Sequence, residues 1–438
     1  MTNEGGKGSF ADLGIDPFFI GRLSGRNIFS PTEIQKQVIP LLLAGGNVLF
    51  RSATGTGKTF AYLIPIFQRL LGGIYHKEPK VPGHREGPED TEEEKGKKDA
   101  GPQNGPGPLV LIAAPTYELC AQIKEEADFL LKGMEGAFPQ SQMPLQPLKV
   151  NLLIGSANTG RQIDALKKDR PAIVVGNPGR LLMLSRMGKL KLRGVRFLVL
   201  DEGDRLTSDE LFGETGELVS LLPQGRISAS CSATVPAKTR ERLAPLLGEA
   251  VETAETEEQE ILRERISHWA LFSEGRRKID TLRSFIAAAD PGGRKGAFKA
   301  LVFSGGGGQP GIILSRLQYN GVKAAGLYGD MDRKKRKEAI DGFRSGKLPV
   351  LVSSDLAARG LDIPGVTHVI ALDVPADDGA YIHRAGRTAR AGKRGIMVTI
   401  GDGDEMRRLA ALEKRLGLTV YPKALYKGKI VAPPSDEE

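Results

Sequence analysis

A glycine-rich turn near the amino terminus has the residue types of a phosphate-binding loop. The octapeptide Ser52-Ala-Thr-Gly-Thr-Gly-Lys-Thr59 follows the apolar run Asn47–Arg51 and precedes the apolar-rich segment Phe60–Leu71. This order predicts a strand, a tight turn and the start of a helix. Backbone N–H groups at a helix start have no partner within the helix, so they favour an anion there.

Individual residues of this turn have the chemistry that a nucleotide requires. Gly55 and Gly57 let the backbone approach phosphate without an intervening Cβ. Lys58 can reach the outer phosphates, and the Thr59 hydroxyl can hold Mg²⁺. The turn therefore predicts nucleotide binding, but it leaves the reaction open, because kinases, GTPases and motor ATPases share it.

Two carboxylates follow a second apolar run. Asp201-Glu-Gly-Asp204 comes directly after Phe197–Leu200, so Asp201 and Glu202 are expected at the tip of a strand. Asp201 can hold Mg²⁺ directly or through water, and Glu202 can orient and deprotonate an attacking water. Acidic residues after a strand also serve as helix caps and turn formers. Together with a phosphate loop in the same sheet, these two carboxylates indicate catalysis.

Two further segments have side chains suited to a nucleotide. The segment His383–Arg390 places Arg384, Arg387 and Arg390 three residues apart, so they lie close together if the segment is helical. Guanidinium groups there suit either a phosphoryl-transfer site or a nucleic-acid backbone. Gln35 is expected in the first turns of a helix, where its amide can read an adenine edge or simply face solvent.

The elements that must position these residues alternate between strand and helix. Near-continuous runs of Val, Ile and Leu are separated by helical segments, which is the pattern of a parallel sheet covered on both faces. Strands are expected near residues 47–51, 109–116, 149–154, 172–175, 196–200 and 226–230, and again near 268–272, 300–303, 322–327, 350–353 and 368–372. In such folds ligands gather at the carboxyl ends of strands.

Two composition changes organise the chain. The acidic stretch Val251–Glu260 loses the apolar pattern, so a domain boundary is expected near residue 255. The resulting domains are residues 1–255 and 256–438, the second with a short C-terminal extension. Residues 75–108 are rich in Pro, Gly and charge and are expected to form a disordered surface insertion.

Composition narrows the class of protein further. The 438 residues are 40% hydrophobic and 26% charged, which is ordinary for a globular protein of two or three domains. The net charge of +9 is compatible with a nucleic-acid partner. Cys120 and Cys231 are expected as reduced core residues, and the polar start Met1–Phe10 is not a secretory signal. A cytoplasmic protein without membrane spans is therefore expected.

Taken in order, these motifs resemble those of the DEAD-box ATP-dependent RNA helicases, from Phe10 to about residue 395. The resemblance implies two tandem RecA-like domains, each a mainly parallel α/β sheet, that bind ATP, Mg²⁺ and single-stranded or short duplex RNA largely without regard to sequence. It also implies a monomer that meets ribonucleoprotein partners.

The resemblance assigns roles residue by residue. ATP contacts are implied for Phe10, Gln35, Ala53, Thr54, Gly55, Thr56, Gly57, Lys58, Thr59 and Asp362, with Phe10 stacking on adenine and Asp362 at the ribose. Thr59 and Asp201 match the metal ligands, and Glu202, Lys58, Arg387 and Arg390 match the catalytic set. Coupling of hydrolysis to unwinding is implied for Asp204, Ser232 and Thr234. RNA contacts are implied for Pro115, Thr116, Gly155, Pro178, Gly179, Arg180, Gly329 and Asp330.

Several positions depart from the family's pattern. Gly203 replaces the alanine of the name-giving tetrapeptide, which changes only a methyl group and leaves all three carboxylates. Tyr117, Ser156 and Asn177 replace Arg, Gly and Thr on the implied RNA path, so the grip on RNA is expected to change. In the second domain the departures are Ser304–Gly308, Tyr328, Arg333, Ser354 and Ala389.

Three functions fit these residues to different degrees. The first is an RNA-stimulated ATPase that unwinds short duplexes or remodels RNA–protein complexes. The second is a clamp or scaffold that binds ATP and RNA with little unwinding, an alternative that Tyr117 and Asn177 keep open. The third is a DNA helicase, which the implied ribose contact of Asp362 argues against, because the 2′-hydroxyl distinguishes RNA from DNA.

Overall fold

The fold is given by a computed structural model, which describes residues 8–52, 57–71, 107–139, 147–232, 234–255, 258–292, 298–305, 309–328, 331–355, 363, 365–375, 378–389 and 393–433. The expected insertion at 75–108 lies almost entirely outside these residues. The chain divides into two compact units. One comprises Met1–Leu49, Thr59–Ser230 and Lys238–Thr253, and the other comprises Phe50–Lys58, Cys231–Ala237 and Ala254–Glu438.

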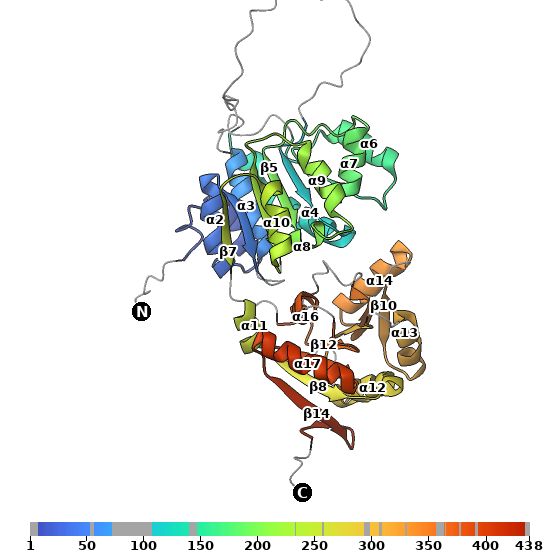
Figure 1. The fold of residues 1–438 in the computed structure, drawn as a ribbon. Helices are drawn as coiled ribbons and strands as arrows, with labels where there is room; N and C mark the ends of the chain where they lie inside the picture. The colour runs from blue at the N-terminus through green and yellow to red at the C-terminus, as the bar shows by residue number, and fades with distance from the viewer. Residues whose placement is uncertain are drawn as a thin grey trace, which may run out of the picture. The chain divides into compact units, whose positions relative to one another are not determined.

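The first sheet, drawn in blue to yellow-green in Figure 1, contains β5 and β7. It has seven strands in the order β3-β4-β2-β5-β6-β1-β7. They are β1 (Asn47–Arg51), β2 (Val110–Ala113), β3 (Val150–Leu153), β4 (Ile173–Gly176), β5 (Phe197–Asp201), β6 (Ile227–Ser232) and β7 (Val251–Glu255). Strands β2 and β4, β2 and β5, and β3 and β4 pair in parallel. The carboxyl ends of β2, β3, β4 and β5 therefore lie at one edge of this sheet.

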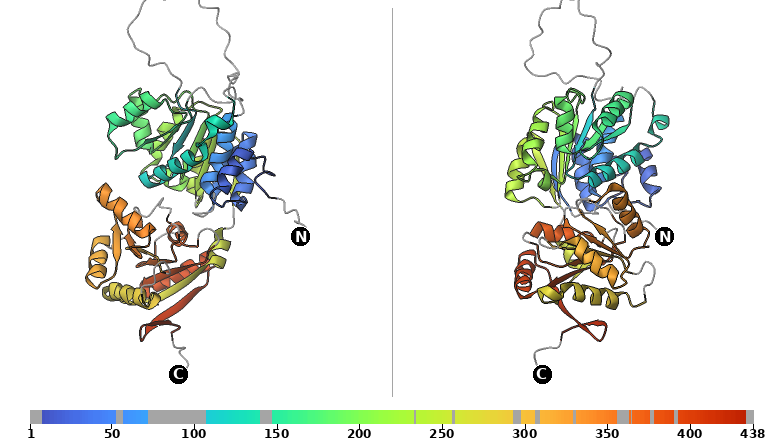
Figure 2. Two further views of the ribbon diagram at one scale, coloured as in Figure 1. Left: turned by 180° about the vertical axis from the view of Figure 1, so that it is seen from behind. Right: turned by 90° about the vertical axis from the view of Figure 1, so that its right-hand side faces the viewer.

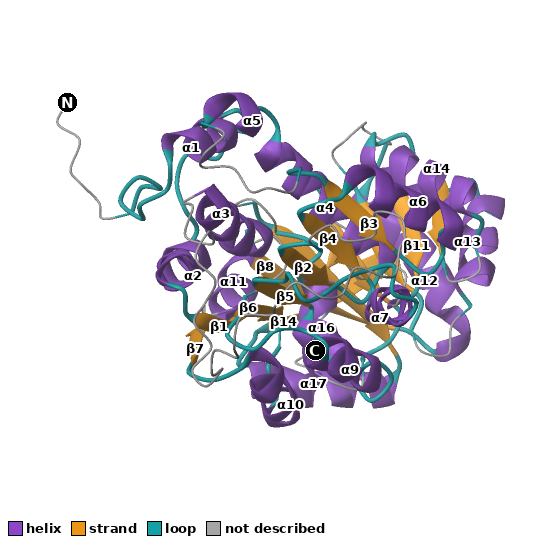
Figure 3. Ribbon diagram, turned by 90° about the horizontal axis from the view of Figure 1, so that it is seen from above, coloured by secondary structure: helices purple, strands orange, loops and turns teal. Residues whose placement is uncertain are grey.

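Helices cover both faces of the first sheet. They are α1 (Pro17–Ser24), α2 (Glu33–Ala44), α3 (Lys58–Leu71), α4 (Tyr117–Leu131), α5 (Met134–Ala137), α6 (Thr159–Asp169), α7 (Pro178–Arg186), α8 (Gly203–Leu206), α9 (Phe212–Ser220) and α10 (Ala237–Leu247). Figures 2 and 3 show α3 and α4 on one side of the strands and α9 and α10 on the other. Strands β2, β4 and β5 are buried along their whole length, as the continuous apolar runs predict.

The second sheet has eight strands in the order β10-β11-β9-β12-β13-β8-β14-β15. They are β8 (Ile266–Phe272), β9 (Ala300–Phe303), β10 (Ala324–Leu327), β11 (Val350–Ser353), β12 (His368–Ala371), β13 (Gly395–Gly401), β14 (Val420–Tyr426) and β15 (Lys429–Val431). Every pairing is parallel except that of β14 with β15. The prediction of mainly parallel sheets is confirmed.

Two apolar cores cover the faces of this second sheet. Its helices are α11 (Glu258–Arg265), η2 (Gly275–Arg277), α12 (Lys278–Ala289), α13 (Pro310–Tyr319), α14 (Arg333–Arg344), α16 (Asp378–Ala385) and α17 (Gly403–Leu416). One core contains side chains of α14, α16 and α17, and the other contains side chains of α12 and α13. Helix α17 begins with a reciprocal cap, in which Asp402 and Glu405 each accept the other's backbone N–H.

The sequence pattern missed several elements at the sheet edges. The acidic segment after Ala250 contains an edge strand, β7, and the C-terminal extension contains the hairpin of β14 and β15. Cys120 and Cys231 are buried free thiols, as expected. Among the residues that the structure describes, no helix is long and apolar enough to cross a membrane.

Candidate functional site

The glycine-rich turn joins β1 to α3. Gly57 has φ +87°, a backbone conformation that residues with a Cβ rarely adopt. Lys58 is the first residue of α3, and its Nζ donates a hydrogen bond to the carbonyl of Ser52 at 2.7 Å. The N–H of Ser52 donates to the carbonyl of Ser232 at 3.1 Å, which ties the ends of β1 and β6 together. Ala53, Thr54, Gly55 and Thr56 lie outside the described residues.

The carboxylate of Asp201 is fixed at the end of β5. It is 4% exposed, and its Oδ2 accepts a hydrogen bond from the Tyr62 hydroxyl at 2.8 Å. Its Oδ1 accepts from the backbone N–H of Glu202 at 2.9 Å. Tyr62 follows Thr59 by three residues, so both lie on the same side of α3. This contact brings the Asp201 carboxylate against the face of α3 that also carries Thr59. Carboxylate and hydroxyl oxygens are ligand types that Mg²⁺ accepts.

Glu202 adopts a strained backbone conformation. Its φ is +54° and its ψ is +57°, in the left-handed region that residues with side chains avoid. The residue is only 7% exposed. Such outliers cluster at functional sites, because only a well-packed surrounding maintains them. Asp204 lies in the short helix α8 that follows, where its Oδ1 accepts the N–H of Arg205.

Two of the three residues expected to couple hydrolysis to unwinding, Ser232 and Thr234, are joined by a hydrogen bond at the end of β6. The Ser232 hydroxyl donates to the carbonyl of Thr234 at 2.6 Å. Ala233 between them lies outside the described residues. Strand β6 neighbours β5, the strand ending at Asp201.

Two residues expected at adenine are engaged with the protein. The Gln35 side-chain oxygen accepts the N–H of Thr32 at 3.0 Å, so it caps the start of α2. Gln35 is 2% exposed and Phe10 is 1% exposed. Protein therefore covers nearly all of the Phe10 ring, and this arrangement leaves no open face for stacking on a base.

A groove on the first sheet brings together five of the residues expected to contact RNA. Pro115, Gly155, Pro178, Gly179 and Arg180 line it, together with Asn177, Met183, Leu211 and Glu214. The five expected residues follow the ends of β2, β3 and β4, so segments that are distant in sequence meet at one edge of the sheet. Arg180 is held by the Thr159 hydroxyl and the Gly155 carbonyl, each at 2.7 Å. Thr116 instead caps α4, and its Oγ1 accepts the N–H of Leu119.

The structure also describes the surroundings of three further side chains in or beside this groove. The Asn177 amide donates to the Ala114 carbonyl at 2.9 Å, so this departure from the family pattern serves as an internal brace between strand ends. Tyr117 is 40% exposed at the start of α4. A Cβ on Gly179 would lie 2.7 Å from Oε2 of Glu214, so a carboxylate lies against the backbone of the groove.

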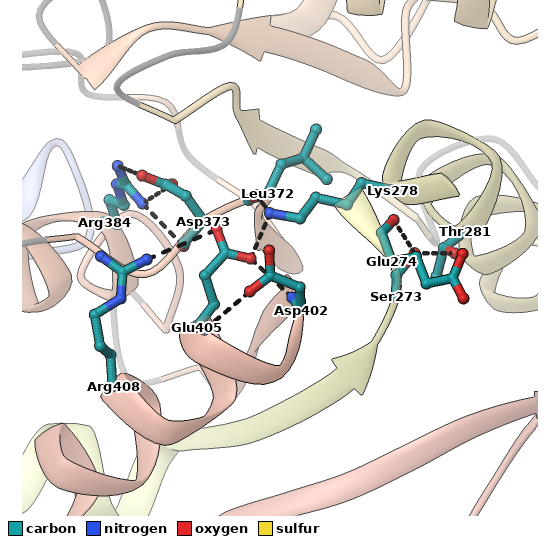
Figure 4. A network of polar contacts seen from close by, with 10 residues as sticks. All are labelled: Ser273, Glu274, Lys278, Thr281, Leu372, Asp373, Arg384, Asp402, Glu405 and Arg408. Carbon is teal, nitrogen blue, oxygen red and sulfur yellow. Dashed lines mark hydrogen bonds and ion pairs between the residues drawn. The ribbon is translucent and has the colours of Figure 1, made fainter. Parts of the chain in front are cut away.

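Arg384 has a structural role rather than a free guanidinium. Its Nε and Nη2 donate to the two oxygens of Asp355, each at 2.6 Å. Its Nη1 donates to Asp373 at 2.6 Å, a contact that Figure 4 shows. Burial alone would lower the pKa of Arg384, but the hydrogen bonds and charges of Asp355 and Asp373 outweigh burial and raise that pKa above its ordinary value. The three groups tie α16 to the ends of β11 and β12.

The segment that carries the three arginines is helical only in part, so its helix does not place Arg384 and Arg387 on one face. Helix α16 ends at Ala385, and Arg387 follows it in a turn, where it is 4% exposed. Arg390, Asp362, Gly329 and Asp330 lie outside the described residues.

A second network fixes the strand ends nearby. Lys278 Nζ donates to the Leu372 carbonyl at 2.8 Å and pairs with Glu405, whose other oxygen is 3.9 Å from Arg408 (Figure 4). Sequence reasoning missed this network, and it also missed Tyr62 and Glu214. The three-residue spacing from Thr59 was an available signal for Tyr62, whereas Glu214 is far in sequence from the groove it enters.

Comparisons with known proteins agree with this geometry. A sequence profile of the DEAD/DEAH box helicase family matches residues 32–243, and one of the helicase conserved C-terminal domain matches residues 277–392. The chain is 32% identical over 402 residues to the DEAD-box ATP-dependent RNA helicase CshC of Bacillus cereus, covering 91% of this chain and 89% of that protein. This chain belongs to the DEAD-box ATP-dependent RNA helicase family.

Other DEAD-box proteins extend the comparison. The DEAD-box ATP-dependent RNA helicase CshA of Bacillus subtilis is 31% identical over 406 residues, which is 93% of this chain and 72% of that protein. The solved structure of S. cerevisiae Dbp5 bound to RNA and ADP BeF3 has a TM-score of 0.73 at 24% identity, covering 95% of this chain and 96% of that one. The solved structure of Mss116p bound to ssRNA and AMP-PNP has a TM-score of 0.77 at 24% identity, covering 100% of this chain and 82% of that one. The fold of two tandem RecA-like domains is thereby confirmed.

Proposed function

We propose that this chain is an ATP-dependent RNA helicase whose hydrolysis of ATP is stimulated by RNA and coupled to local unwinding or to remodelling of RNA–protein complexes. One observation carries the proposal. Strands β2, β3, β4 and β5 are parallel and end at one sheet edge, which carries both the groove and the Asp201–Glu202 pair. An RNA strand in the groove would contact the ends of β2, β3 and β4, and β2 neighbours β5, the strand that ends at Asp201.

The proposal also gives each residue expected at the nucleotide a role. Lys58 and the glycine-rich turn would bind the phosphates, and Glu202 would orient and deprotonate the attacking water. Thr59 and Asp201 would hold Mg²⁺, which supplies neutralisation of phosphate charge when bound. Arg387 and Arg390 are assigned to stabilise charge that develops in the transition state. Gln35 and Asp362 are assigned to adenine and ribose.

Finer features belong to the same proposal. The tetrapeptide Asp201–Asp204 is a variant of the family's motif with glycine at its third position. Asp204, Ser232 and Thr234 link hydrolysis to unwinding, and the domain boundary lies near residue 255. The chain acts as a monomer on ribonucleoprotein partners in the cytoplasm, where the two buried free thiols would stay reduced.

Strand separation tests the proposal and its clamp alternative together. A short labelled RNA duplex is mixed with the protein and ATP, and release of one strand is followed. The wild type should separate the strands. Lys58→Ala should fail because ATP binding is weakened, and Glu202→Gln should fail while still binding ATP and RNA. Lys414→Ala, an exposed lysine on α17, is the control and should behave as the wild type.

Two outcomes would contradict the proposal, and each one rejects a different part of it. If the wild type holds RNA in the presence of ATP but separates no strands, the chain is a clamp. If Lys58→Ala retains the nucleotide affinity of the wild type, the phosphate-loop assignment is wrong.

A further inference from the structure

Gly203 is packed so closely that a methyl group does not fit at this position. A Cβ built on its backbone would lie closer than 3.0 Å to the Ser230 hydroxyl oxygen. It would also lie 3.1 and 3.4 Å from the two terminal methyl groups of Leu243. Real Cβ atoms essentially never show the first of these separations. The change from alanine to glycine within the motif is therefore more than the loss of a methyl group, because other side chains occupy the space.

Ser230 occupies that space and makes a specific contact. It lies on β6 with no exposed surface, and its Oγ donates a hydrogen bond to the carbonyl of Leu200 at 3.1 Å. Leu200 directly precedes Asp201. The hydroxyl thus ties β6 to β5 one residue before the proposed metal ligand and two before the proposed general base.

The backbone between these contacts is the strained part of the site. Glu202 has φ +54°, and Gly203 follows it as the first residue of α8. A glycine here allows the turn to lie directly against β6, since close approach of two backbones needs a residue without Cβ. The Ser230 hydroxyl therefore contacts the chain on both sides of the Asp201–Glu202 pair, at the Leu200 carbonyl before it and at Gly203 after it.

We propose that Gly203 and Ser230 act as a complementary pair of positioning residues, which together set the place of the Asp201–Glu202 turn against β6. The proposal rests on the proposed function, in which Glu202 activates the attacking water. Glycine is required at position 203 because serine stands at position 230, and the serine hydroxyl in turn holds the strand end that leads into Asp201.

This pairing predicts the effect of restoring the family's alanine. In Gly203→Ala the new methyl group would force the Ser230 hydroxyl out of its position and break its bond to Leu200. A buried hydroxyl without its hydrogen-bond partner is unfavourable. The turn that carries Asp201 and Glu202 would therefore shift, either in place of the hydroxyl or together with it. Replacing Ser230 with alanine at the same time removes the oxygen and makes room for the methyl group.

Four variants of the full chain test the pair: Gly203→Ala, Ser230→Ala, the double variant, and Gly216→Ala. Gly216 lies in α9 with no atom within 4 Å of a built Cβ, so its substitution is a matched control. For each variant, kcat and KM for ATP are measured at saturating single-stranded RNA, and Tm is measured without ligands. The double variant makes the coupling between the two positions directly measurable.

The expected pattern is a loss in Gly203→Ala that the second substitution repairs. Gly203→Ala should lower kcat by about tenfold or more with a smaller change in KM, since misplacing a catalytic group by about 1 Å can cost on the order of a hundredfold. Ser230→Ala alone removes the hydrogen bond to Leu200 without adding a clash, so it should lower kcat less than Gly203→Ala does. The double variant should recover kcat to within about threefold of the wild type, because the two substitutions are coupled. Gly216→Ala should have the same kcat as the wild type.

Two results would overturn the pairing. One is a kcat for Gly203→Ala close to that of the wild type, and if Tm falls at the same time, the pair is reduced to a packing contact. The other is a double variant whose kcat is as low as that of Gly203→Ala. Glu202→Gln is measured alongside: if it turns over ATP normally, the proposed role of Glu202 fails, whatever the pair does.

Discussion

At the scale of single residues, several side chains with a proposed chemical role are held in place by a neighbouring group. Tyr62 fixes Asp201, and the Gly155 carbonyl and Thr159 hydroxyl fix Arg180. Lys58 rests on a carbonyl of its own loop. These supports are what makes the site rigid enough to bind in one geometry.

The Tyr62 hydroxyl gives a direct test of this support. Tyr62→Phe removes one donor to Asp201 and leaves the ring packing, so the carboxylate should become less well positioned for Mg²⁺. Binding of a fluorescent ATP analogue, followed while Mg²⁺ is titrated, should need roughly threefold to tenfold more Mg²⁺, as the loss of one hydrogen bond implies. Tyr319→Phe, on a 91% exposed ring, is the control. Equal Mg²⁺ requirements in both variants would contradict the role of Tyr62.

Glu214 gives a second test at this scale. Its carboxylate lies against Gly179 in the groove proposed for RNA, where it would repel a phosphate. Glu214→Gln should therefore bind single-stranded RNA about threefold more tightly at low salt, with the gain shrinking as salt rises. Fluorescence anisotropy measures the affinity. Glu241→Gln makes the same charge change on an exposed position of α10, and an equal gain there would attribute the effect to net charge alone.

At the scale of elements, patterns of buried residues predicted most of the architecture. The strands at 300–303 and 350–353 have the expected bounds, because each is a continuous or nearly continuous apolar run that is buried along its whole length. Strand β7 was missed, since in Val-Glu-Thr-Ala-Glu only Ala254 is buried. Edge strands such as β7 and β15 are held by backbone hydrogen bonds, which no side-chain pattern reveals.

The end of α16 shows why the arginine cluster could not be assigned from spacing. Spacing by three residues implies proximity only while a helix continues, and this helix ends at Ala385. The partners of Arg384 are Asp355 and Asp373, which are distant in sequence, so their ion pairs depend on tertiary structure. The sequence therefore identifies an arginine suited to bind phosphate, but it does not reveal that Arg384 pairs with two aspartates.

The Arg384 contacts predict a large loss of stability on substitution. Its side chain is 3% exposed, so Arg384→Met would leave two partly covered carboxylates without their cation. The free energy of unfolding should fall by about 2–3 kcal/mol, less than for a fully buried pair because both aspartates keep some exposure. Urea unfolding measures it. Arg407→Met, in an ion pair 78% exposed, should cost under about 1 kcal/mol, and an equal loss in both variants would contradict the structural role.

At the scale of the whole molecule, two parallel sheets are the part of the structure that sequence predicts best. Both sheets follow from runs of Val, Ile and Leu, and the site residues follow from their places at strand ends. The groove was predicted only as separate segments, since which strand ends are neighbours depends on the order β3-β4-β2-β5. The acidic side chain within it has no sequence signal.

Two histidines of the second sheet, the buried His268 and the partly buried His368, predict how stability depends on pH. Burial lowers the pKa of His368 to about 4 from its ordinary 6.5, and burial lowers the pKa of His268 as well. Unfolding returns His368 to its ordinary pKa, so the unfolded chain binds the extra proton first as pH falls. Stability should therefore decrease as pH falls from about 6.5 towards 4, by on the order of 1–3 kcal/mol for His368.

Urea unfolding at neutral and mildly acidic pH checks this dependence. His368→Gln cannot take up a proton, so its stability should fall less than that of the wild type over the same interval. An identical acid dependence in wild type and variant would show that His368 is not the group responsible.

The measurement that tests the central claim most directly is steady-state ATP hydrolysis at low salt, without nucleic acid, with single-stranded RNA, and with single-stranded DNA of the same sequence. An RNA-dependent helicase predicts strong stimulation by RNA and little by DNA. Background hydrolysis in the presence of bound RNA would contradict the helicase cycle. Equal stimulation by DNA would contradict recognition of RNA through its ribose.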